Sequence, residues 1–374
     1  MSKIDDHKSG LVKAGAGADL LRLYESLWNT AQVTIPGGSC ATVGIGGLTL
    51  GGGYGLISRQ FGLTVDALAE VTMVDASGRR VQASESRHSD LFWALRGGGA
   101  NNFGVVVDLT FRTSPVSDAT IFFIQWPWDS IDTVVPIFQQ WSDPTELDSR
   151  LTPILTLPSK ETDHISVIGE FLGSGHELQN LLDPLLAIPN RTAFTLKTIP
   201  YIGAVRHFSG LTADASTWRA HGTSDHNTFK NTSAYAYEIF PASALDIIQN
   251  ALANTPGAAC LVQLGGFGGA IRDRAPRATA FYHRLARSEM QYQAYWTHPS
   301  QASTHIRWVE NFRRAMNPYT QGAYFNYCDR SIQDWPTAYW GENLARLKAV
   351  KRDWDPHNIF RFPQGLSELT RLRC

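Results

Sequence analysis

The chain lacks the features that mark membrane, secreted and nucleic-acid-binding proteins. Its first eight residues, MSKIDDHK, are polar and contain no apolar core of a signal peptide. No uninterrupted apolar run is long enough to span a bilayer. The 33 Lys and Arg nearly balance the 34 Asp and Glu, and no block of like charge indicates a nucleic-acid groove or an anionic membrane surface. We therefore expect a cytoplasmic protein with no nucleic-acid or membrane partner, and the oligomeric state stays open.

Cysteine is scarce, and common metal motifs are missing. The chain has four cysteines, too far apart for a dense disulfide framework or a CxxC zinc motif: Cys40, Cys260, Cys328 and Cys374. No H-E-x-x-H or G-x-S-x-G occurs. A histidine pair at 221 and 226 has no third ligand nearby in the sequence, so we expect no metal site.

What is present is the composition of an ordinary globular protein, 43% hydrophobic and 18% charged, with enough residues for two cores. Leu20, Leu23 and Leu27 recur at helical spacing. Strand alternation over residues 70–73, followed by the turn residues 75–78 and a new apolar position at 81, predicts a hairpin. A short helix is predicted over 90–96, ended by Gly97.

The pattern of predicted secondary structure changes after residues 114–115. Strands are predicted over 121–126, 165–172 and 258–264, alternating with helices over 131–141, 242–253 and 278–287. This alternation favours an α+β domain, an antiparallel sheet with helices on one face. A last helix over 342–354 is stopped by Asp355-Pro356.

The most informative stretch is PGGSCATVGIGGLTLGGGYG, residues 36–55. Dense glycine strips side chains from the backbone, which permits positive φ angles and lets a flat or anionic ligand approach bare N–H groups. The segment contains no G-x-G-x-x-G and no Walker A motif, so neither a Rossmann nor a P-loop site fits it. The alternative interpretation is a set of tight turns in a β-rich core.

This run resembles P-G-G-x-C-P-T-V-G-x-G-G-x-x-x-G-G-G-x-G of the berberine-bridge-enzyme-like FAD-linked oxidases, with Ala41 in place of the usual proline. Three further segments resemble family motifs and occur in family order: DLFWALRGGGANNFGVV (90–106), TAFYHR (279–284) and WDPHNIFRF (354–362). The resemblance extends from about Leu11 to Leu366.

The resemblance implies a partial PCMH-type FAD-binding domain over 1–114, a substrate domain over 115–325 and a C-terminal segment, 326–374, that returns to the FAD domain. It implies FAD as cofactor, bonded covalently through the Cys40 sulfur, a plausible nucleophile. The expected flavin-contacting positions are Gly44, Gly46, Gly47, Gly52, Gly53, Gly104, Val106 and Asn326. Val43 stands where family members control oxygen access, although a valine chosen for a strand explains it equally well.

Catalytic residues are expected in two strands. EMQYQAYW (289–296) resembles K-I-Q-Y-x-x-x-W, which points Gln291 at the substrate and places Glu289 where many members have lysine. AYFNYCD (323–329) resembles A-Y-x-N-Y-x-D, which makes Tyr324 a base or orienting group and places Asn326 beside the flavin. An unperturbed phenol has a pKa of roughly 10, so Tyr324 needs help to act as a base. Core packing is the alternative role for both strands.

Family members also carry an R-x-G-G-H-S loop that cradles the FAD pyrophosphate, and nothing in residues 1–36 matches it. We therefore expect the N-terminal part of the FAD domain to be missing. The predicted function is oxidation of a small organic substrate, such as a sugar, alcohol or secondary metabolite, by hydride transfer to flavin N5, with O2 as electron acceptor. The alternatives are a non-catalytic remnant and a flavin-independent cyclase or isomerase that uses Gln291 and Tyr324.

Overall fold

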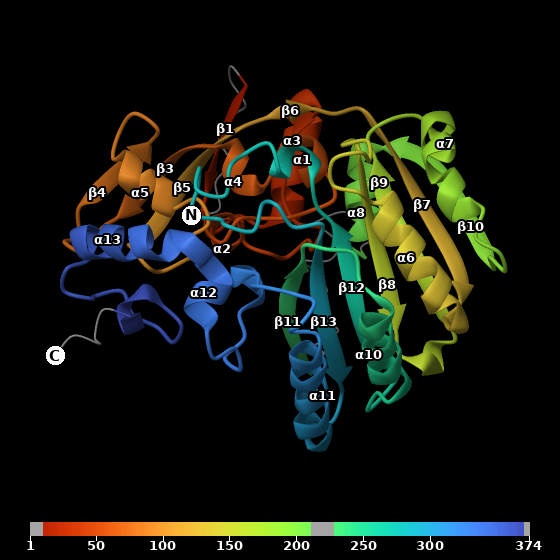
Figure 1. The fold of residues 1–374 in the computed structure, drawn as a ribbon. Helices are drawn as coiled ribbons and strands as arrows, with labels where there is room; N and C mark the ends of the chain where they lie inside the picture. Colours follow the sequence, from red (N-terminus) through yellow and green to blue (C-terminus); the bar gives the residue numbers. More distant parts are fainter. Residues whose placement is uncertain (1–9, 211–227, 370–374) are drawn as a thin grey trace.

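The computed structural model describes residues 10–210 and 228–369, which form two antiparallel sheets with surrounding helices (Figure 1). The four-stranded sheet has the order β1 (Leu11–Gly15), β5 (Val105–Arg112), β3 (Leu68–Val74), β4 (Arg80–Ser84). The seven-stranded sheet has the order β10 (Ala193–Pro200), β7 (Asp118–Pro127), β9 (His164–Phe171), β8 (Leu151–Pro158), β12 (Cys260–Gly266), β13 (Ser288–Trp296), β11 (Thr228–Ala236). A short pair, β2 (Val33–Thr34) and β6 (Ser114–Pro115), forms a separate two-stranded sheet.

Helices flank both sheets. Those before β7 are α1 (Leu20–Ala31), α2 (Ile45–Leu50), α3 (Ser58–Phe61), α4 (Thr64–Ala67) and α5 (Ser89–Ala94). Those that follow are α6 (Ile131–Trp141), α7 (Gly175–Leu186), α8 (Tyr201–Phe208), α10 (Ala242–Ala253), α11 (Ala302–Ala315), α12 (Trp335–Trp340) and α13 (Leu344–Trp354). The predicted α+β class, a partial PCMH-type domain joined to an antiparallel sheet with helices on one face, is confirmed.

Local sequence patterns account for several of these elements. The apolar stripe of α1 is buried, and Asp19 caps the helix by accepting a hydrogen bond from the Arg22 N–H at 2.9 Å. The predicted hairpin is β3–β4, with Gly78 at φ +80° in its turn, where a side chain would be strained. The helices predicted over 131–141 and 242–253 are α6 and α10.

The two faces of the seven-stranded sheet differ in chemistry. In Figure 1, α6, α10 and α11 cover one face. Met290, Tyr292 and Ala294 of β13 point into the core on that side. Strand geometry therefore turns the alternate residues of β13, from Glu289 to Tyr295, to the opposite face, which meets the four-stranded domain. We call this opposite face the polar face.

The C-terminal segment packs on the first domain. Helix α13 lies against α5, with Leu347 and Val350 in the same core as Leu91 (Figure 1). The Trp354 indole donates a hydrogen bond to Asp90 at 3.1 Å. The chain therefore returns to the domain where it began, although the domain boundaries at 114 and 325 stay predictions.

Two predicted elements are wrong. Residues 278–287 form no helix, because the N–H groups of Ala280 and Phe281 donate to the Trp93 and Arg96 carbonyls at the end of α5. Residues 323–329 form no strand; Phe325–Tyr327 is a single 3-10 turn. In both segments long-range contacts replace the local hydrogen bonds on which periodicity depends.

Candidate active site

The glycines of the run over 36–55 fall into two groups. Gly44 and Gly47 are exposed, and a Cβ added to either would meet no atom within 4 Å. Gly44 also has an ordinary φ of −72°. Neither internal packing nor backbone strain requires glycine at these positions, so the bare surface leaves room for an external ligand.

The remaining glycines that were predicted to contact the cofactor are explained by packing. A Cβ on Gly46 would lie 2.8 Å from the Ala16 carbonyl oxygen. Gly52 and Gly53 have φ of +128° and +79°. A Cβ on Gly104 would collide with Met73 and with the backbone of residue 74. Their contact with a cofactor, like that of Val106, stays a prediction.

Cys40 lies at the exposed surface of the same run, next to the polar face. Although the residue is exposed, the surrounding protein removes enough water from the thiol to raise its pKa, and a hydrogen bond with Ser39 offsets part of this. Burial raises the pKa values of Tyr295 and Tyr327, and the nearby Cys40 adds to both shifts. The thiol is therefore close to β13 and to the segment after Tyr324. Val43 is half-buried, and its N–H donates to the Cys40 carbonyl at 3.3 Å.

Tyr324 is buried and connects the two halves of the site. Its phenolic oxygen accepts hydrogen bonds from the Gly53 N–H at 2.9 Å and from the Asn326 side-chain amide at 2.8 Å. The same amide donates to the Leu48 carbonyl at 2.9 Å. Burial raises the pKa of Tyr324 to about 12, and the two donors offset part of that shift. Tyr324 and Asn326 are thus joined by a hydrogen bond, and they do not share a strand face, because this segment forms no strand.

Glu289 is a buried carboxyl group among tyrosines. Desolvation raises its pKa to about 8, and its Oε1 has no hydrogen-bond partner among the described residues. It lies directly opposite Tyr235 in the β11–β13 register. It is also near enough to contribute to the raised pKa values of Tyr54 and Tyr324. Sequence reasoning did not single out Tyr54. The sequence feature that could have indicated it is that Tyr54 is the only aromatic residue in the glycine run.

Gln291 lies on β13, opposite Ser233 of β11 and Gln263 of β12. It is half-buried, and its amide has no hydrogen bond among the described residues. Of the two expected catalytic strands, only the one that carries Gln291 forms, because Tyr324 is not in a strand. Both nevertheless adjoin β11, since the Tyr324 N–H donates to Ser233.

A hydrogen-bonded ladder crosses three strands of the polar face. The Tyr295 hydroxyl donates to Gln293 at 2.7 Å, the Gln293 amide donates to Gln263 at 2.8 Å, and Gln263 donates to Thr156 at 3.0 Å. Phe229 is 56% exposed and its ring centroid lies 5.9 Å from that of Tyr295. Sequence reasoning missed this ladder, because it depends on which strands are neighbours.

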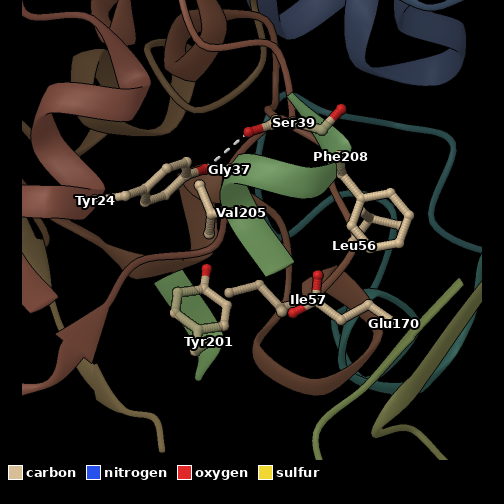
Figure 2. A pocket seen from close by; sticks show the side chains of 10 residues that line it. Tyr24, Gly37, Ser39, Leu56, Ile57, Glu170, Tyr201, Val205 and Phe208 are labelled. Carbon is tan, nitrogen blue, oxygen red and sulfur yellow. Dashed lines mark hydrogen bonds between the residues drawn. The ribbon is translucent and has the colours of Figure 1, made fainter. Parts of the chain in front are cut away.

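A small cavity lies beneath the start of the glycine run, between the two domains (Figure 2). Tyr24 of α1 borders it and donates from its hydroxyl to the Gly38 carbonyl at 3.0 Å. Tyr201 of α8 and Glu170 of β9 form the other polar walls. Desolvation raises the pKa of Glu170 to about 8, and its Oε1 has no partner among the described residues. The sequence carried no signal for this buried acid.

Metal and membrane features are absent from the described part of the chain. Residues 10–210 and 228–369 hold no group of three or more His, Cys, Asp or Glu side chains that could bind a metal ion. Within the same ranges no helix is long and apolar enough to cross a bilayer. The histidine pair at 221 and 226 lies outside the described residues.

Two family descriptions match the chain. "FAD binding domain" matches residues 1–84, which include the glycine run, and "Berberine and berberine like" matches residues 323–367, which include Tyr324 and Asn326. An uncharacterized FAD-linked oxidoreductase of Bacillus subtilis, YgaK, is 38% identical over 95% of this chain and 77% of its own length. The chain belongs to the berberine-bridge-enzyme-like family of FAD-linked oxidoreductases.

The chain is also similar to an oxidase and to a solved structure of this family. A chitooligosaccharide oxidase of Gibberella zeae is 30% identical over 96% of this chain and 75% of that protein. Among solved structures, BBE-like 1 of Physcomitrella patens has a TM-score of 0.90 and 31% identity, over 98% of this chain and 79% of that one. The chain thus spans about three quarters of the length of these relatives.

The site fits the isoalloxazine end of FAD. Gly44 and Gly47 leave open surface beside the exposed Cys40, and Asn326 holds the adjoining backbone at Leu48. These residues, together with Val43, would hold the flavin ring, a flat group that requires bare backbone on one side. Family membership makes the chain an FAD-linked oxidoreductase; covalent attachment through Cys40 stays a prediction.

Proposed function

We propose that this oxidoreductase oxidises an alcohol or hemiacetal carbon of a small carbohydrate and passes the electrons to O2. The observation that carries the substrate class is the ladder of Tyr295, Gln293 and Gln263 on the polar face, next to the exposed ring of Phe229. Amide groups can both donate to and accept from sugar hydroxyls. An exposed aromatic ring offers an apolar platform for the C–H face of a pyranose.

The likeness to a chitooligosaccharide oxidase supports the same substrate class. Gln291 supports it from within the site, because its amide faces the polar side of the sheet with no partner among the described residues. It is therefore free to orient a substrate hydroxyl. Binding of an alkaloid, by contrast, would leave the Gln291 amide unpaired in a site closed to water, which costs about 1–3 kcal/mol.

Tyr324 and Glu289 form the proton-accepting pair of the proposed reaction. The Gly53 N–H and the Asn326 amide both point at the Tyr324 oxygen, so they stabilise it as its proton passes to the ionised Glu289 and it takes the proton of the substrate hydroxyl. Glu289 has a pKa of about 8, so its carboxylate is available as a proton acceptor mainly above about pH 8. Bound FAD supplies the hydride acceptor, so the substrate loses one hydride and one proton in total.

O2 as final acceptor rests on Val43. Its side chain is short and half-buried, and its N–H donates to the Cys40 carbonyl, so in this proposal it would leave room for O2 at the flavin edge. A valine at this position goes with oxidase behaviour in the family.

The test uses FAD-loaded protein and a panel of mono- and oligosaccharides, simple alcohols, aromatic alcohols and an alkaloid, with hydrogen peroxide release as readout. We expect turnover to concentrate on sugars. Gln293→Leu should raise the sugar KM roughly 10-fold, since it removes one buried hydrogen-bonding group. Gln179→Leu, at an exposed position of α7, is the matched control and should leave KM unchanged. Preference for an aromatic alcohol or the alkaloid, with no effect of Gln293→Leu, would refute the substrate class.

A further inference from the structure

The backbone beside Tyr324 is held in place by residues of α11 and β11. Arg313, near the end of α11, donates from Nε to the Ser233 carbonyl at 2.9 Å and from a terminal nitrogen to the Gly322 carbonyl at 3.1 Å. One guanidinium group therefore joins β11 to the segment that carries Tyr324. The fixed fork geometry of arginine suits this double contact, which a lysine cannot reproduce.

Ser233 completes the connection. It is fully buried, and its hydroxyl accepts the Tyr324 N–H at 2.8 Å while its carbonyl accepts Arg313. Two backbone hydrogen bonds between Tyr235 and Gln321, at 2.8 and 2.9 Å, attach the same segment to β11. The backbone of Tyr324 is thus fixed by one edge strand and one arginine.

The segment needs such support because it has little structure of its own. Residues 322–324 lie in no helix or strand. Gly322 adopts φ +66° against the His283 ring, which leaves no room for a side chain that could anchor the backbone there. A misplacement of about 1 Å at a catalytic group can lower the rate roughly 100-fold.

We propose that Arg313 and Ser233 are positioning residues for Tyr324, which keep its phenolic oxygen within reach of the substrate hydroxyl. The inference rests on the proposed proton-accepting role of Tyr324. Arg313 acts through geometry: it contacts the two carbonyls and not the phenol.

The first test compares single variants of the FAD-loaded protein in stopped-flow flavin reduction. Arg313→Met and Ser233→Ala should each lower the limiting reduction rate roughly 10- to 100-fold while the substrate Kd stays within about twofold. Ser233→Thr, which keeps the hydroxyl, should restore most of the rate. Arg313→Lys should fall between the parent and Arg313→Met. Arg314→Met is the matched control, since Arg314 is exposed and bonds only Asn311 within the described chain.

The second test separates positioning from a general loss of structure. If the two residues act through Tyr324, Ser233→Ala and Arg313→Met should have almost no further effect in a Tyr324→Phe background, because the group they position is gone. The inference would be overturned if the rate losses in the double variants equalled the sum of the single effects, or if the single variants reduced at the parent rate. Either result would leave the role of Tyr324 intact. An unchanged rate in Tyr324→Phe itself would overturn the proposed base and this inference with it.

A third readout needs no cofactor. In protein labelled at tyrosine Cζ, the NMR resonance of Tyr324, assigned by its loss in Tyr324→Phe, reports the hydrogen bonds to the phenol. Ser233→Ala should shift that resonance and Ser233→Thr should not. An identical resonance in Ser233→Ala and the parent would contradict the proposal.

Discussion

The phenolic oxygen of Tyr324 accepts a hydrogen bond from the backbone N–H of Gly53, a residue 271 positions earlier, at 2.9 Å. Gly53 belongs to the glycine run and has φ +79°, so its N–H direction depends on a backbone conformation that side chains rarely adopt. The contact joins the expected flavin surface to the expected proton acceptor. In the proposed mechanism, the glycine run would therefore act on the proton acceptor as well as contact the cofactor.

Tyr324→Phe removes the hydroxyl that we propose accepts the substrate proton. General-base assistance contributes about 10²–10⁴-fold, so flavin reduction should slow by that factor. Gln291→Leu should slow flavin reduction less than Tyr324→Phe does, since it removes only a hydrogen bond that orients the substrate. Stopped-flow absorbance separates reduction from reoxidation, and reoxidation should be nearly unchanged in both variants. A Tyr324→Phe variant that reduces as fast as the parent would make Tyr324 a packing residue.

The raised pKa of Glu289 leads to a prediction for the pH dependence of flavin reduction. Its pKa is near 8, and only the ionised carboxylate accepts a proton, so the reduction rate should rise as pH increases through about 8. Glu289→Gln should flatten this rise and lower the plateau. The measurement is the limiting reduction rate from pH 6 to 10. An unaltered pH profile in Glu289→Gln would exclude Glu289 as the titrating group.

Cys40 predicts a covalent flavin. Protein loaded with FAD and then precipitated with acid should keep its yellow colour, because a thioether survives unfolding. Cys40→Ala should release the colour to the supernatant. Cys328→Ala, at the other exposed cysteine of the described residues, is the control and should behave like the parent. Colour retained by the Cys40→Ala pellet would show that the attachment lies elsewhere.

The position of Val43 leads to a prediction for the rate at which O2 reoxidises the reduced flavin. Val43→Leu adds volume beside Cys40, at the expected route of O2 to the flavin edge. We expect slower reoxidation by O2 and unchanged reduction, the reverse of Tyr324→Phe. The oxygen dependence of reoxidation measures this directly. Equal reoxidation in Val43→Leu and the parent would remove Val43 from the proposed oxygen route.

Glu170 predicts how folding stability changes with pH. Its pKa is near 8 in the folded state and 4.5 in the unfolded chain, so the unfolded state loses the proton first as pH rises. Stability should therefore fall between about pH 4.5 and pH 8, and Glu289 contributes a second slope of the same sign.

Between pH 5 and pH 8.5, Glu170 should lower the free energy of unfolding by roughly 2–5 kcal/mol. Glu170→Gln should abolish this part of the pH dependence. Urea unfolding at the two pH values measures the difference, and Glu161→Gln at an exposed position is the control. Equal slopes in Glu170→Gln and the parent would show that Glu170 is solvated in the folded protein.

The sequence alone determined the elements whose stability is local. The apolar stripe of α1, the turn at Gly78 and helices α6 and α10 follow from spacing within a few residues. The glycine run was also recognisable, because residue type is visible without structure. Resemblance added the family, the cofactor and the expected role of Tyr324.

Only the tertiary structure decided how these parts combine. It made residues 278–287 an irregular segment, because Ala280 and Phe281 bond to the end of α5. It separated Gly44 and Gly47, which leave open surface, from the glycines that packing requires. It buried Glu170 and Glu289 without partners in the described chain, which moved their pKa values toward neutrality. Periodicity reports contacts within one element, whereas burial and the Gly53–Tyr324 contact depend on residues that are neighbours only after folding.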